Sequence, residues 1–324
     1  MSSWSLLLPR DIRNHILSYL DQYNKYYPVI NYKKYLIKYV AGNNETNKEL
    51  KQLSNLQVLY CECNSKFTDE GIKHLTNLQV LKCLNTNFTD KILSNLTNLQ
   101  ILYCGFNTNF TDEGIKHLTN LQILYCDWNT NFTDEGIKHL TGLQELDCGG
   151  NTNFTDEGIK HLTGLQKLDC VGNNKFTDAG IKHLAGLQKL GCGENNKFTD
   201  AGIKHLTNLQ VLKCWDSNFT DAGLKKLTNC KLLFCNNIFT DAGIKHLTNL
   251  QILYCEENNK FTDKGIKHLI NLQVLDCGWN TNFTDEGIKH LTGLQELECG
   301  RNTNFTDEGI KHLTGLQILN ERFN

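Results

Sequence analysis

The sequence predicts an α/β solenoid in which short parallel strands alternate with short helices. The stretch TGLQELDCGGNTNFTDEGIKHL at residues 141–162 returns at residues 292–313 with only two differences, at positions 147/298 and 150/301. Each copy has a strand-like half and a helix-like half. A fixed period of about 22 residues is typical of solenoids, which stack one structural unit many times. Twelve copies are marked by the phenylalanine of an FTD tripeptide: Phe67, Phe88, Phe110, Phe132, Phe154, Phe176, Phe198, Phe219, Phe239, Phe261, Phe283 and Phe305.

Within one copy, Leu143, Leu146 and Cys148 alternate with polar residues, which predicts a short half-buried strand. A loop rich in Asn, Thr and Gly begins at Asn151 and has the composition of a turn. Thr155-Asp156 then supplies capping oxygens for a helix, and either residue fits the N-cap. Ile159 and Leu162 follow on one helical face. Each copy is therefore expected to form a strand, a loop and one or two helical turns.

A single copy buries too little apolar surface to offset the entropy of ordering its chain, so neighbouring copies must cover its faces. Strands in a ladder lie about 4.8 Å apart, whereas packed helices need about 10 Å. Stacking both in register predicts a curve with the strands on the concave side and the helices on the convex side.

The pattern LxxLxCxxNxxFTDxGIxxL resembles the leucine-rich repeat, with Leu143, Leu146, Cys148 and Asn151 on the LxxLxLxxN core. Its TDxGI part is similar to the cysteine-containing and TDAGL-type subclasses, and the resemblance covers residues 53–319. It implies a horseshoe whose concave face binds a ligand. We expect an N-terminal segment at 1–40, a linker at 41–52, and a solenoid of about 12 repeats at 53–324. The Asn- and Lys-rich, near-identical copies are similar to repeat families of AT-rich genomes, including giant DNA viruses of amoebae.

Residues 1–40 lie outside the repeat and contain both prolines, Pro9 and Pro28. The stretch LLLPRDIRNHILSYL has apolar residues at helical spacing behind Pro9. It resembles the opening of an F-box, which implies that the segment docks on the adaptor subunit of a cullin-based (SCF-type) ubiquitin ligase. The family's usual second half, with a Cys and a Trp, is missing after Leu20, so a helical cap on the solenoid is the alternative. The adaptor-binding residues implied by the resemblance are Leu8, Pro9, Ile12, Ile16, Leu17 and Leu20.

Composition excludes several classes of function. The formal net charge of −2 gives no basic field for nucleic acid, and no apolar run reaches the length of a membrane span. Residues 6–8 are too short for a signal-peptide core, so we expect a cytoplasmic or nuclear protein that is not secreted. Of the 14 cysteines, twelve recur at one strand position, and we expect them to be reduced packing residues rather than disulfides or metal ligands. They are Cys61, Cys83, Cys104, Cys126, Cys148, Cys170, Cys192, Cys214, Cys235, Cys255, Cys277 and Cys299.

The histidines and aspartates also recur in columns. The histidines follow a lysine in IKHL, on the side of the helix away from its Ile and Leu, so we expect an exposed convex column. The aspartates of FTD are expected to be helix caps, and the loop asparagines are expected to bond the loop backbone. The chain has no P-loop, no dinucleotide glycine fingerprint and no unique catalytic set. We therefore predict a protein that is not an enzyme, without a cofactor, a catalytic residue or a metal site.

The copies differ most beside the inward strand residues and just after the cysteine, and this is where we place the binding surface. Exposed clustered aromatic residues mark interaction sites, and Trp and Tyr dominate binding hot spots. Acidic residues outnumber basic ones nearby, which favours a partner bearing Lys or Arg. The predicted surface binds a protein, either as the substrate receptor of a ubiquitin ligase or as a stand-alone binding module. Its residues are Tyr103, Phe106, Tyr125 and Trp128 as the main patch, with Trp215, Phe234, Tyr254 and Trp279 as a second anchor.

Overall fold

The computed structural model describes residues 36–320, except residues 43, 63, 65, 85, 86 and 303. The chain forms two compact units, Met1–Gly142 (unit 1) and Leu143–Asn324 (unit 2). Both units repeat the same strand–loop–helix arrangement. The predicted adaptor-binding residues Leu8 to Leu20 lie outside the described residues.

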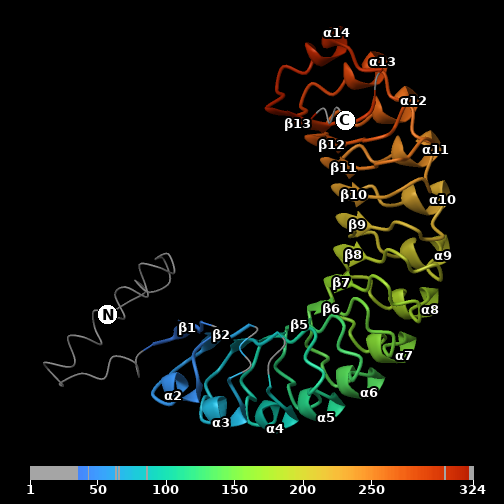
Figure 1. Cartoon of the computed structure of the whole chain (residues 1–324). Helices are drawn as coiled ribbons and strands as arrows, with labels where there is room; N and C mark the ends of the chain where they lie inside the picture. The colour runs from blue at the N-terminus through green and yellow to red at the C-terminus, as the bar shows by residue number, and fades with distance from the viewer. Residues whose placement is uncertain are drawn as a thin grey trace, which may run out of the picture. The chain divides into compact units, whose positions relative to one another are not determined.

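The described part of unit 1 contains five parallel strands that pair in chain order, with one short helix after each strand (Figure 1). The pairing is in register, so that each strand residue lies beside the equivalent residue of the next repeat. The strands are β1 (Lys38–Val40), β2 (Val58–Tyr60), β3 (Val80–Lys82), β4 (Ile101–Tyr103) and β5 (Ile123–Tyr125). The helices are α2 (Asn47–Leu50), α3 (Asp69–Ile72), α4 (Asp90–Leu93), α5 (Asp112–Ile115) and α6 (Asp134–Ile137).

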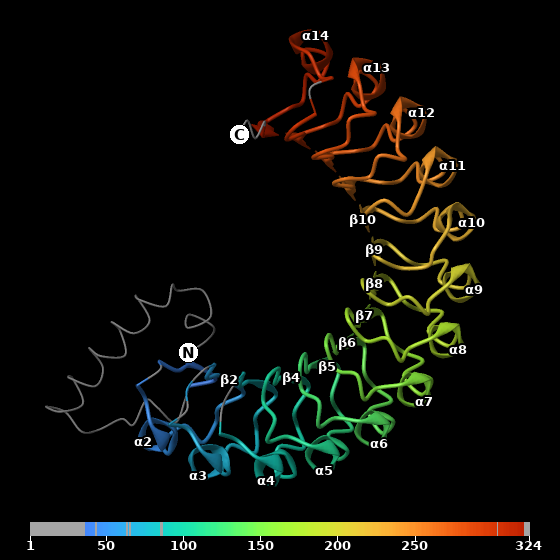
Figure 2. The same cartoon turned by 45° about the vertical axis from the view of Figure 1, so that its right-hand side comes forward.

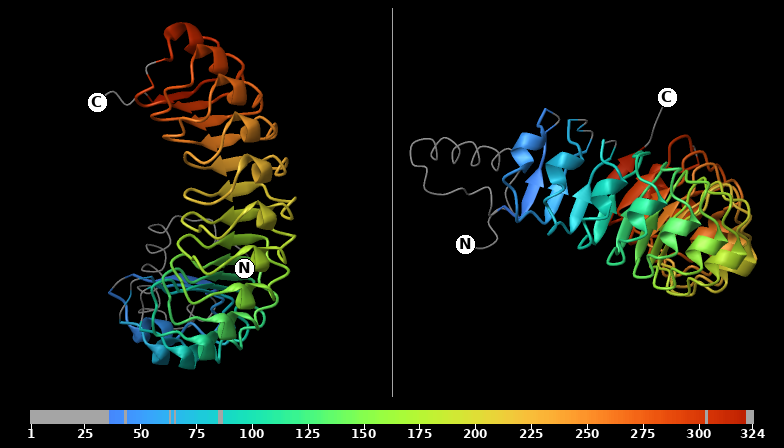
Figure 3. Two further views of the ribbon diagram at one scale, coloured as in Figure 1. Left: turned by 90° about the vertical axis from the view of Figure 1, so that its right-hand side faces the viewer. Right: turned by 90° about the horizontal axis from the view of Figure 1, so that it is seen from below.

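Unit 2 contains nine parallel strands in chain order, again in register. Its strands lie on the inner side of a curve and its helices on the outer side (Figure 2), and the helices form one row (Figure 3). The strands are β6 (Glu145–Asp147), β7 (Lys167–Asp169), β8 (Lys189–Gly191), β9 (Val211–Lys213), β10 (Leu232–Phe234), β11 (Ile252–Tyr254), β12 (Val274–Asp276), β13 (Glu296–Glu298) and β14 (Ile318–Asn320). The helices are α7 (Asp156–Ile159), α8 (Asp178–Ile181), α9 (Asp200–Ile203), α10 (Asp221–Leu224), α11 (Asp241–Ile244), α12 (Asp263–Ile266), α13 (Asp285–Ile288) and α14 (Asp307–Ile310).

The solenoid begins earlier than the predicted boundary at residue 53. Strand β1 pairs with β2, and helix α2 lies inside the segment predicted to be a linker. Thr46 caps α2 and Leu50 is fully buried, so residues 38–50 act as a degenerate first repeat. Sequence periodicity missed this repeat because Asn47 stands where the later copies carry aspartate.

Within each unit, a pair of hydrogen bonds joins the start of one helix to the start of the next. Thr155 is the N-cap of α7, and its side chain accepts from the Glu157 N–H. The Asp156 carboxylate instead accepts from the next repeat, from the Thr177 N–H at 2.8 Å and the Thr177 hydroxyl at 2.5 Å. The prediction that the FTD aspartates are caps is therefore wrong. The threonines cap the helices, and the aspartates bridge repeats because their carboxylates can accept two bonds at once.

This bridge explains why the TDxGI motif contains a glycine. A Cβ on Gly180 would collide with the Asp156 carboxylate of the preceding repeat, so only glycine leaves room for the aspartate. Asn47 bridges to Thr68 in the same way in the first repeat, through an amide oxygen and an amide nitrogen at 3.0 and 2.8 Å. The TD and G positions are thus coupled between neighbouring copies.

The core consists of stacked columns of buried side chains, and nearly every repeat contributes three Leu and one each of Cys, Phe and Ile. Leu143, Leu146 and Cys148 are all buried, as the alternation predicted. The loop asparagines are also buried, and they bond the loop backbone as expected: the Asn173 amide donates to the Asn151 carbonyl at 2.7 Å and accepts from the Lys175 N–H at 2.8 Å. Within the described residues every buried side-chain polar atom has a hydrogen-bond partner. No helix in this part of the chain has both the length and the apolar composition of a membrane span.

Candidate functional site

The exposed face of each sheet is formed by the first and third residues of the three-residue strands, because the middle residue points into the core. In β11, for example, Leu253 is buried while Ile252 and Tyr254 are half-buried. We call this exposed face the strand face. The parallel register places equivalent side chains of consecutive repeats beside one another, so any shared property of those residues becomes a continuous column.

The main predicted patch, in unit 1, consists of two stacked aromatic pairs. Tyr103 and Tyr125 are register partners, and their rings stack with centroids 4.5 Å apart and planes within 7°. Phe106 and Trp128 lie in the loops after these strands, with centroids 6.4 Å apart, and their side chains are 56% and 58% exposed. Neighbouring repeats therefore bring the four predicted residues together pairwise, as the sequence predicted.

Charged residues border this patch. The Lys82 ammonium lies 5.3 Å from the Tyr103 ring centroid and pairs with Glu62. Its hydrogen bond to Glu62 raises the pKa of Lys82, which keeps the cation charged. Asp127 packs against Gly105, where a Cβ would collide with its carboxylate, and burial raises the pKa of this carboxyl. The patch is thus apolar at its centre with both signs of charge at its edge.

The loops after strands β4–β9 and β11–β13 each contain a residue in the left-handed backbone conformation. Besides the four residues compared below, these are Glu194, Asp216, Glu257, Trp279 and Arg301. Phe106 has φ of 58° and Trp128 has φ of 57°, whereas Gly150 and Gly172 occupy the equivalent place with φ of 69° and 73°. The conformation is imposed by an inter-repeat bond, in which the Phe106 N–H donates to the Asp127 carbonyl at 3.0 Å and the Gly150 N–H to the Val171 carbonyl at 2.9 Å. Glycine adopts this conformation without cost, and bulky residues there are rare.

The second predicted anchor, in unit 2, is a cluster of three aromatic rings rather than four. Trp215 contacts Phe234 edge to face at 5.2 Å, and Phe234 contacts Tyr254 at 5.7 Å. The Trp215 indole lies flat over Gly193, where any Cβ would collide with it. Trp279 makes its ring contact with the Arg301 guanidinium, 4.0 Å from the indole centroid, and not with the other three rings. The predicted grouping of Trp279 with this cluster is therefore not seen among the described residues.

An aliphatic column beside the aromatic residues was missed from the sequence. The first strand residues Ile101 and Ile123 in unit 1 are half-buried, and so are Leu232 and Ile252 in unit 2. These side chains adjoin the aromatic third positions and widen the apolar surface. The sequence could have revealed this column. The residue three positions before the ladder cysteine is aliphatic in these copies, whereas it is Glu or Lys in β6, β7 and β8.

Charge varies along the strand face of unit 2. Strands β6–β8 carry alternating charges, including a Lys167–Glu145 ion pair of 2.6 Å. Acidic residues surround the three-ring cluster and the strands after it. They are Glu194, Asp216, Glu256, Glu257, Asp276, Glu296 and Glu298, against Lys213 and Arg301. The second anchor is therefore an apolar cluster in a predominantly acidic setting.

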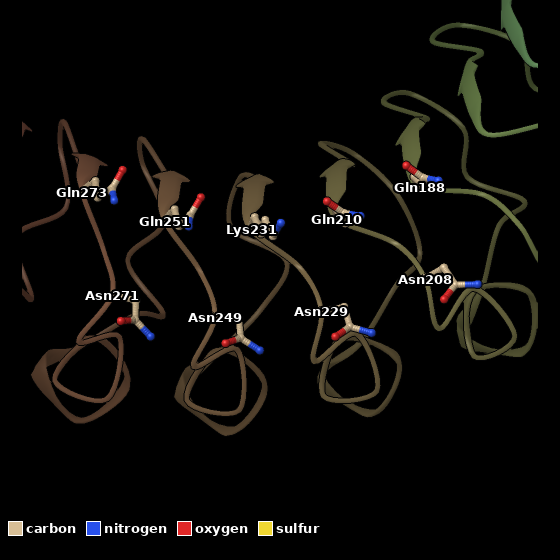
Figure 4. Close-up of a pocket in the computed structure, with 9 residues that line it drawn as sticks. All are labelled: Gln188, Asn208, Gln210, Asn229, Lys231, Asn249, Gln251, Asn271 and Gln273. Carbon is tan, nitrogen blue, oxygen red and sulfur yellow. The ribbon is translucent and has the colours of Figure 1, made fainter.

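A groove of about 630 Å³ runs along the amino-terminal edge of strands β8–β12 and was not predicted (Figure 4). One row of lining residues precedes the strands and the other lies in the turns after the helices. The Asn229 and Asn249 amides each donate to a carbonyl of the preceding repeat, at 2.9 and 3.0 Å, so the second row has a structural role. The lining residues are Gln188, Gln210, Lys231, Gln251 and Gln273 in the first row and Asn208, Asn229, Asn249 and Asn271 in the second.

The cysteine and histidine columns behave as packing and surface residues in the described part of the chain. All twelve ladder cysteines are buried thiols, and some donate to a carbonyl of the next strand, such as Cys170 to Gly191 at 3.3 Å. Burial raises the pKa of Cys170 well above its usual value. The histidines from His117 onward are exposed, and His74 approaches the Leu50 carbonyl at 3.2 Å. No group of three or more His, Cys, Asp or Glu among the described residues could hold a metal ion.

Comparisons with known proteins identify the fold. No protein-family model and no curated protein matches the chain. Among solved structures, an internalin (inlF) of Listeria monocytogenes is 20% identical with a TM-score of 0.60, over 90% of this chain and 88% of that one. The functional domain of InlJ of Listeria monocytogenes, described as including a cysteine ladder, is 24% identical with a TM-score of 0.62, over 89% and 69%. The Leptospira interrogans leucine-rich-repeat protein LIC12759 is 25% identical with a TM-score of 0.62, over 88% and 86%. The predicted leucine-rich-repeat fold is thus confirmed.

Proposed function

We propose that this chain is a protein-binding module whose strand face holds a polypeptide with apolar side chains beside Lys or Arg. The aromatic pairs of unit 1 form the main contact surface, and the three-ring cluster of unit 2 forms a second one. The leucine-rich-repeat fold supports this class of function because it presents a long exposed sheet face, bordered by loops whose sequence varies from copy to copy.

The observation that carries the proposal is the exposure of two large aromatic side chains that stack on each other. Phe106 and Trp128 occupy left-handed positions at which Gly150 and Gly172 serve in the same fold. Holding a non-glycine residue there costs about 1–2 kcal/mol, and more than half of each ring is exposed to water. Charged residues such as Glu194 and Asp216 hold the same conformation in other repeats, so the support for binding is the exposed rings themselves, which offer two large and rigid contact groups.

The chemistry of the partner follows from the surroundings of the rings. Aromatic and aliphatic side chains together favour apolar anchors, which supply most of the binding energy in interface hot spots. Acidic residues around Trp215, Phe234 and Tyr254 favour a basic partner, mainly through selectivity and rate of association.

Selection from a random-peptide library displayed on phage, with the full chain as bait, tests this proposal. We expect enrichment of peptides that combine aromatic or aliphatic residues with Lys or Arg. Trp128→Ala should weaken the binding of selected peptides by at least about 2 kcal/mol, the hot-spot threshold, with little loss of fold. His183→Ala, on the exposed helix side, is the matched control and should bind normally. If peptides bind Trp128→Ala as well as the wild type, the strand face is not the binding surface.

We further propose that the module acts as the substrate receptor of an SCF-type ubiquitin ligase. The support is the F-box-like pattern at Leu8, Pro9, Ile12, Ile16, Leu17 and Leu20, which would bind the adaptor subunit. The alternative is a stand-alone binding module in which residues 1–40 only cap the solenoid. Capture of the adaptor by the full chain distinguishes the two, since only the ligase role requires it.

A further inference from the structure

The helices provide a second and chemically different surface. In six repeats the second helix residue is Glu, and it pairs with the lysine three residues later. Examples are Glu113–Lys116 and Glu135–Lys138, each at 2.5 Å. Paired lysines of this kind lie partly against their own helix, with side chains 31% and 34% exposed. In these repeats the glutamate offsets the charge of the C-cap lysine.

Five consecutive repeats of unit 2 lack this pairing. The second residue of α8, α9, α10 and α11 is alanine, and in α12 it is Lys264. The C-cap lysines of these helices are all exposed, and none has an ion-pair partner within the described residues. They are Lys182, Lys204, Lys225, Lys245 and Lys267.

Two more lysines strengthen the charge in the same repeats. Lys226 stands where most other copies carry histidine, and Lys264 stands where most carry Glu or Ala. Each helix also begins with an aspartate, but those carboxylates bridge the repeats: the Asp178 oxygens accept from the Thr199 N–H at 2.9 Å and the Thr199 hydroxyl at 2.5 Å. The same bridge holds Asp156 and Asp285 in the flanking repeats, so the aspartates do not distinguish the repeats. The difference is that each of α8–α12 has one aspartate for one or two lysines and no glutamate. We call the exposed lysines of α8–α12 the lysine band.

The lysine band is bounded at both ends. Helix α7 has Asp156 and Glu157 with Lys160, and α13 has Asp285 and Glu286 with Lys289, so each carries two acids for one base. A long polyanion would leave the band and meet net negative repeats on either side. The band spans four steps between helices, or about 40 Å at about 10 Å per helix, which an extended peptide of about 12 residues covers.

We propose that the lysine band binds an acidic polypeptide segment of about this length, rich in Asp and Glu. Charge complementarity and the limited length favour such a segment over nucleic acid. The side chains of α8–α12 include no aromatic residue on which bases could stack, and lysine lacks the fork with which arginine grips phosphate. This surface is separate from the strand face, so the two predicted partners differ in charge.

The repeats themselves supply the test variant. The substitutions Ala179→Glu, Ala201→Glu, Ala222→Glu and Ala242→Glu restore the residue that the paired repeats carry, so the fold is expected to tolerate them. Gln at the same four positions is the matched uncharged control. The probes are a fluorescent 12-residue Asp/Glu-rich peptide, the same peptide with Asn and Gln, and a 12-base-pair DNA duplex, measured by fluorescence anisotropy with the full chain.

We expect the acidic peptide to bind and the neutral peptide not to bind, with affinity falling about tenfold between low and physiological salt. The four-Glu variant should lose at least about tenfold in affinity while the four-Gln variant binds normally. In the reverse direction, Glu157→Ala with Glu286→Ala frees Lys160 and Lys289 and should tighten binding about twofold.

Failure of the acidic peptide to bind, or equal binding by the four-Glu variant, would overturn the proposal. Tighter binding of the DNA duplex than of the peptide would show that the partner class is wrong. Concentration-dependent self-association that the four-Glu variant abolishes would instead make a second copy of this chain the occupant. Because the strand face is untouched, the library selection with Trp128→Ala reports on the proposed function independently.

Discussion

Raising the pH above about 9 should unfold this chain abruptly, because ionisation of its buried cysteines opposes folding. Burial raises the pKa of nine thiols from the ordinary value of 9.0: Cys61, Cys104, Cys170, Cys192, Cys214, Cys230, Cys235, Cys255 and Cys277. A thiol with a raised folded pKa keeps its proton in the folded state and loses it in the unfolded state. Stability is therefore intact below the unfolded pKa and falls as the pH rises above it.

The size of the effect follows from the number of thiols. At pH 10, one unit above the unfolded value, each protected thiol favours unfolding by about 1.4 kcal/mol. Nine thiols together contribute about 13 kcal/mol, which is comparable to the whole stability of about 5–15 kcal/mol of a typical domain. The unfolding midpoint should therefore lie between pH 9 and pH 10.

Circular dichroism and thiolate absorbance, followed together across pH 7–11, test this reasoning. Both signals should change in one steep step, because each thiol ionises only as its repeat opens. Lysine and tyrosine titrate near pH 10 as well, so a variant is needed to isolate the thiols. Cys170→Ala, Cys192→Ala and Cys214→Ala together remove three of nine thiols and should lower the pH slope of stability by about a third. A wild-type chain that stays folded at pH 11, or a triple variant with an unchanged slope, would refute this account.

Three further predictions concern single contacts. Asp156→Ala should lower the free energy of unfolding, measured by heat or urea, by about 2 kcal/mol, because the Thr177 N–H and hydroxyl lose their acceptor. Asp156→Asn should lower it by less than half of that. Equal losses for the two variants would argue against the bridge. Trp128→Gly should be about 1 kcal/mol more stable than Trp128→Ala, since glycine alone relieves the left-handed backbone, and the reverse order would remove the strain argument. Leu8→Ala with Pro9→Ala should abolish adaptor capture while the circular dichroism of the solenoid is unchanged; loss of the fold would identify a cap instead.

Much of the fold could be predicted because the same pattern of apolar and polar residues recurs in every copy of the repeat. Alternation placed Leu143, Leu146 and Cys148 in the core, and the LxxLxCxxN pattern with TDxGI identified the leucine-rich repeat. What a single repeat cannot reveal is a bond to the next one. Thr155 and Asp156 look equally suited to cap a helix, and only stacking shows that the aspartate reaches forward to Thr177.

The candidate site also has features that could be predicted from the sequence and features that could not. The stacking of Tyr103 on Tyr125 could be predicted, because parallel register places equivalent residues side by side. The left-handed conformation of Phe106 could not, since it accompanies the bond from the Phe106 N–H to the Asp127 carbonyl in the next loop. The capture of Trp279 by Arg301 was also missed, although the two residues lie one repeat apart. Contacts between unlike residues of neighbouring copies carry no periodic signal.

Comparison of equivalent positions in neighbouring copies shows which substitutions the repeat tolerates. Positions that contact the next repeat, such as Asp156, Gly180 and Asn173, hardly vary, because a change at one must be matched by its neighbour. The left-handed loop residue and the second helix residue vary freely. The loop residues of adjacent repeats contact one another, as Trp279 and Arg301 do, but they share no partner with the second helix residue. Changes at these two positions should therefore add without coupling to stability, as expected for sites without shared partners. This separation lets one scaffold carry an aromatic and acidic strand face together with a basic helix face.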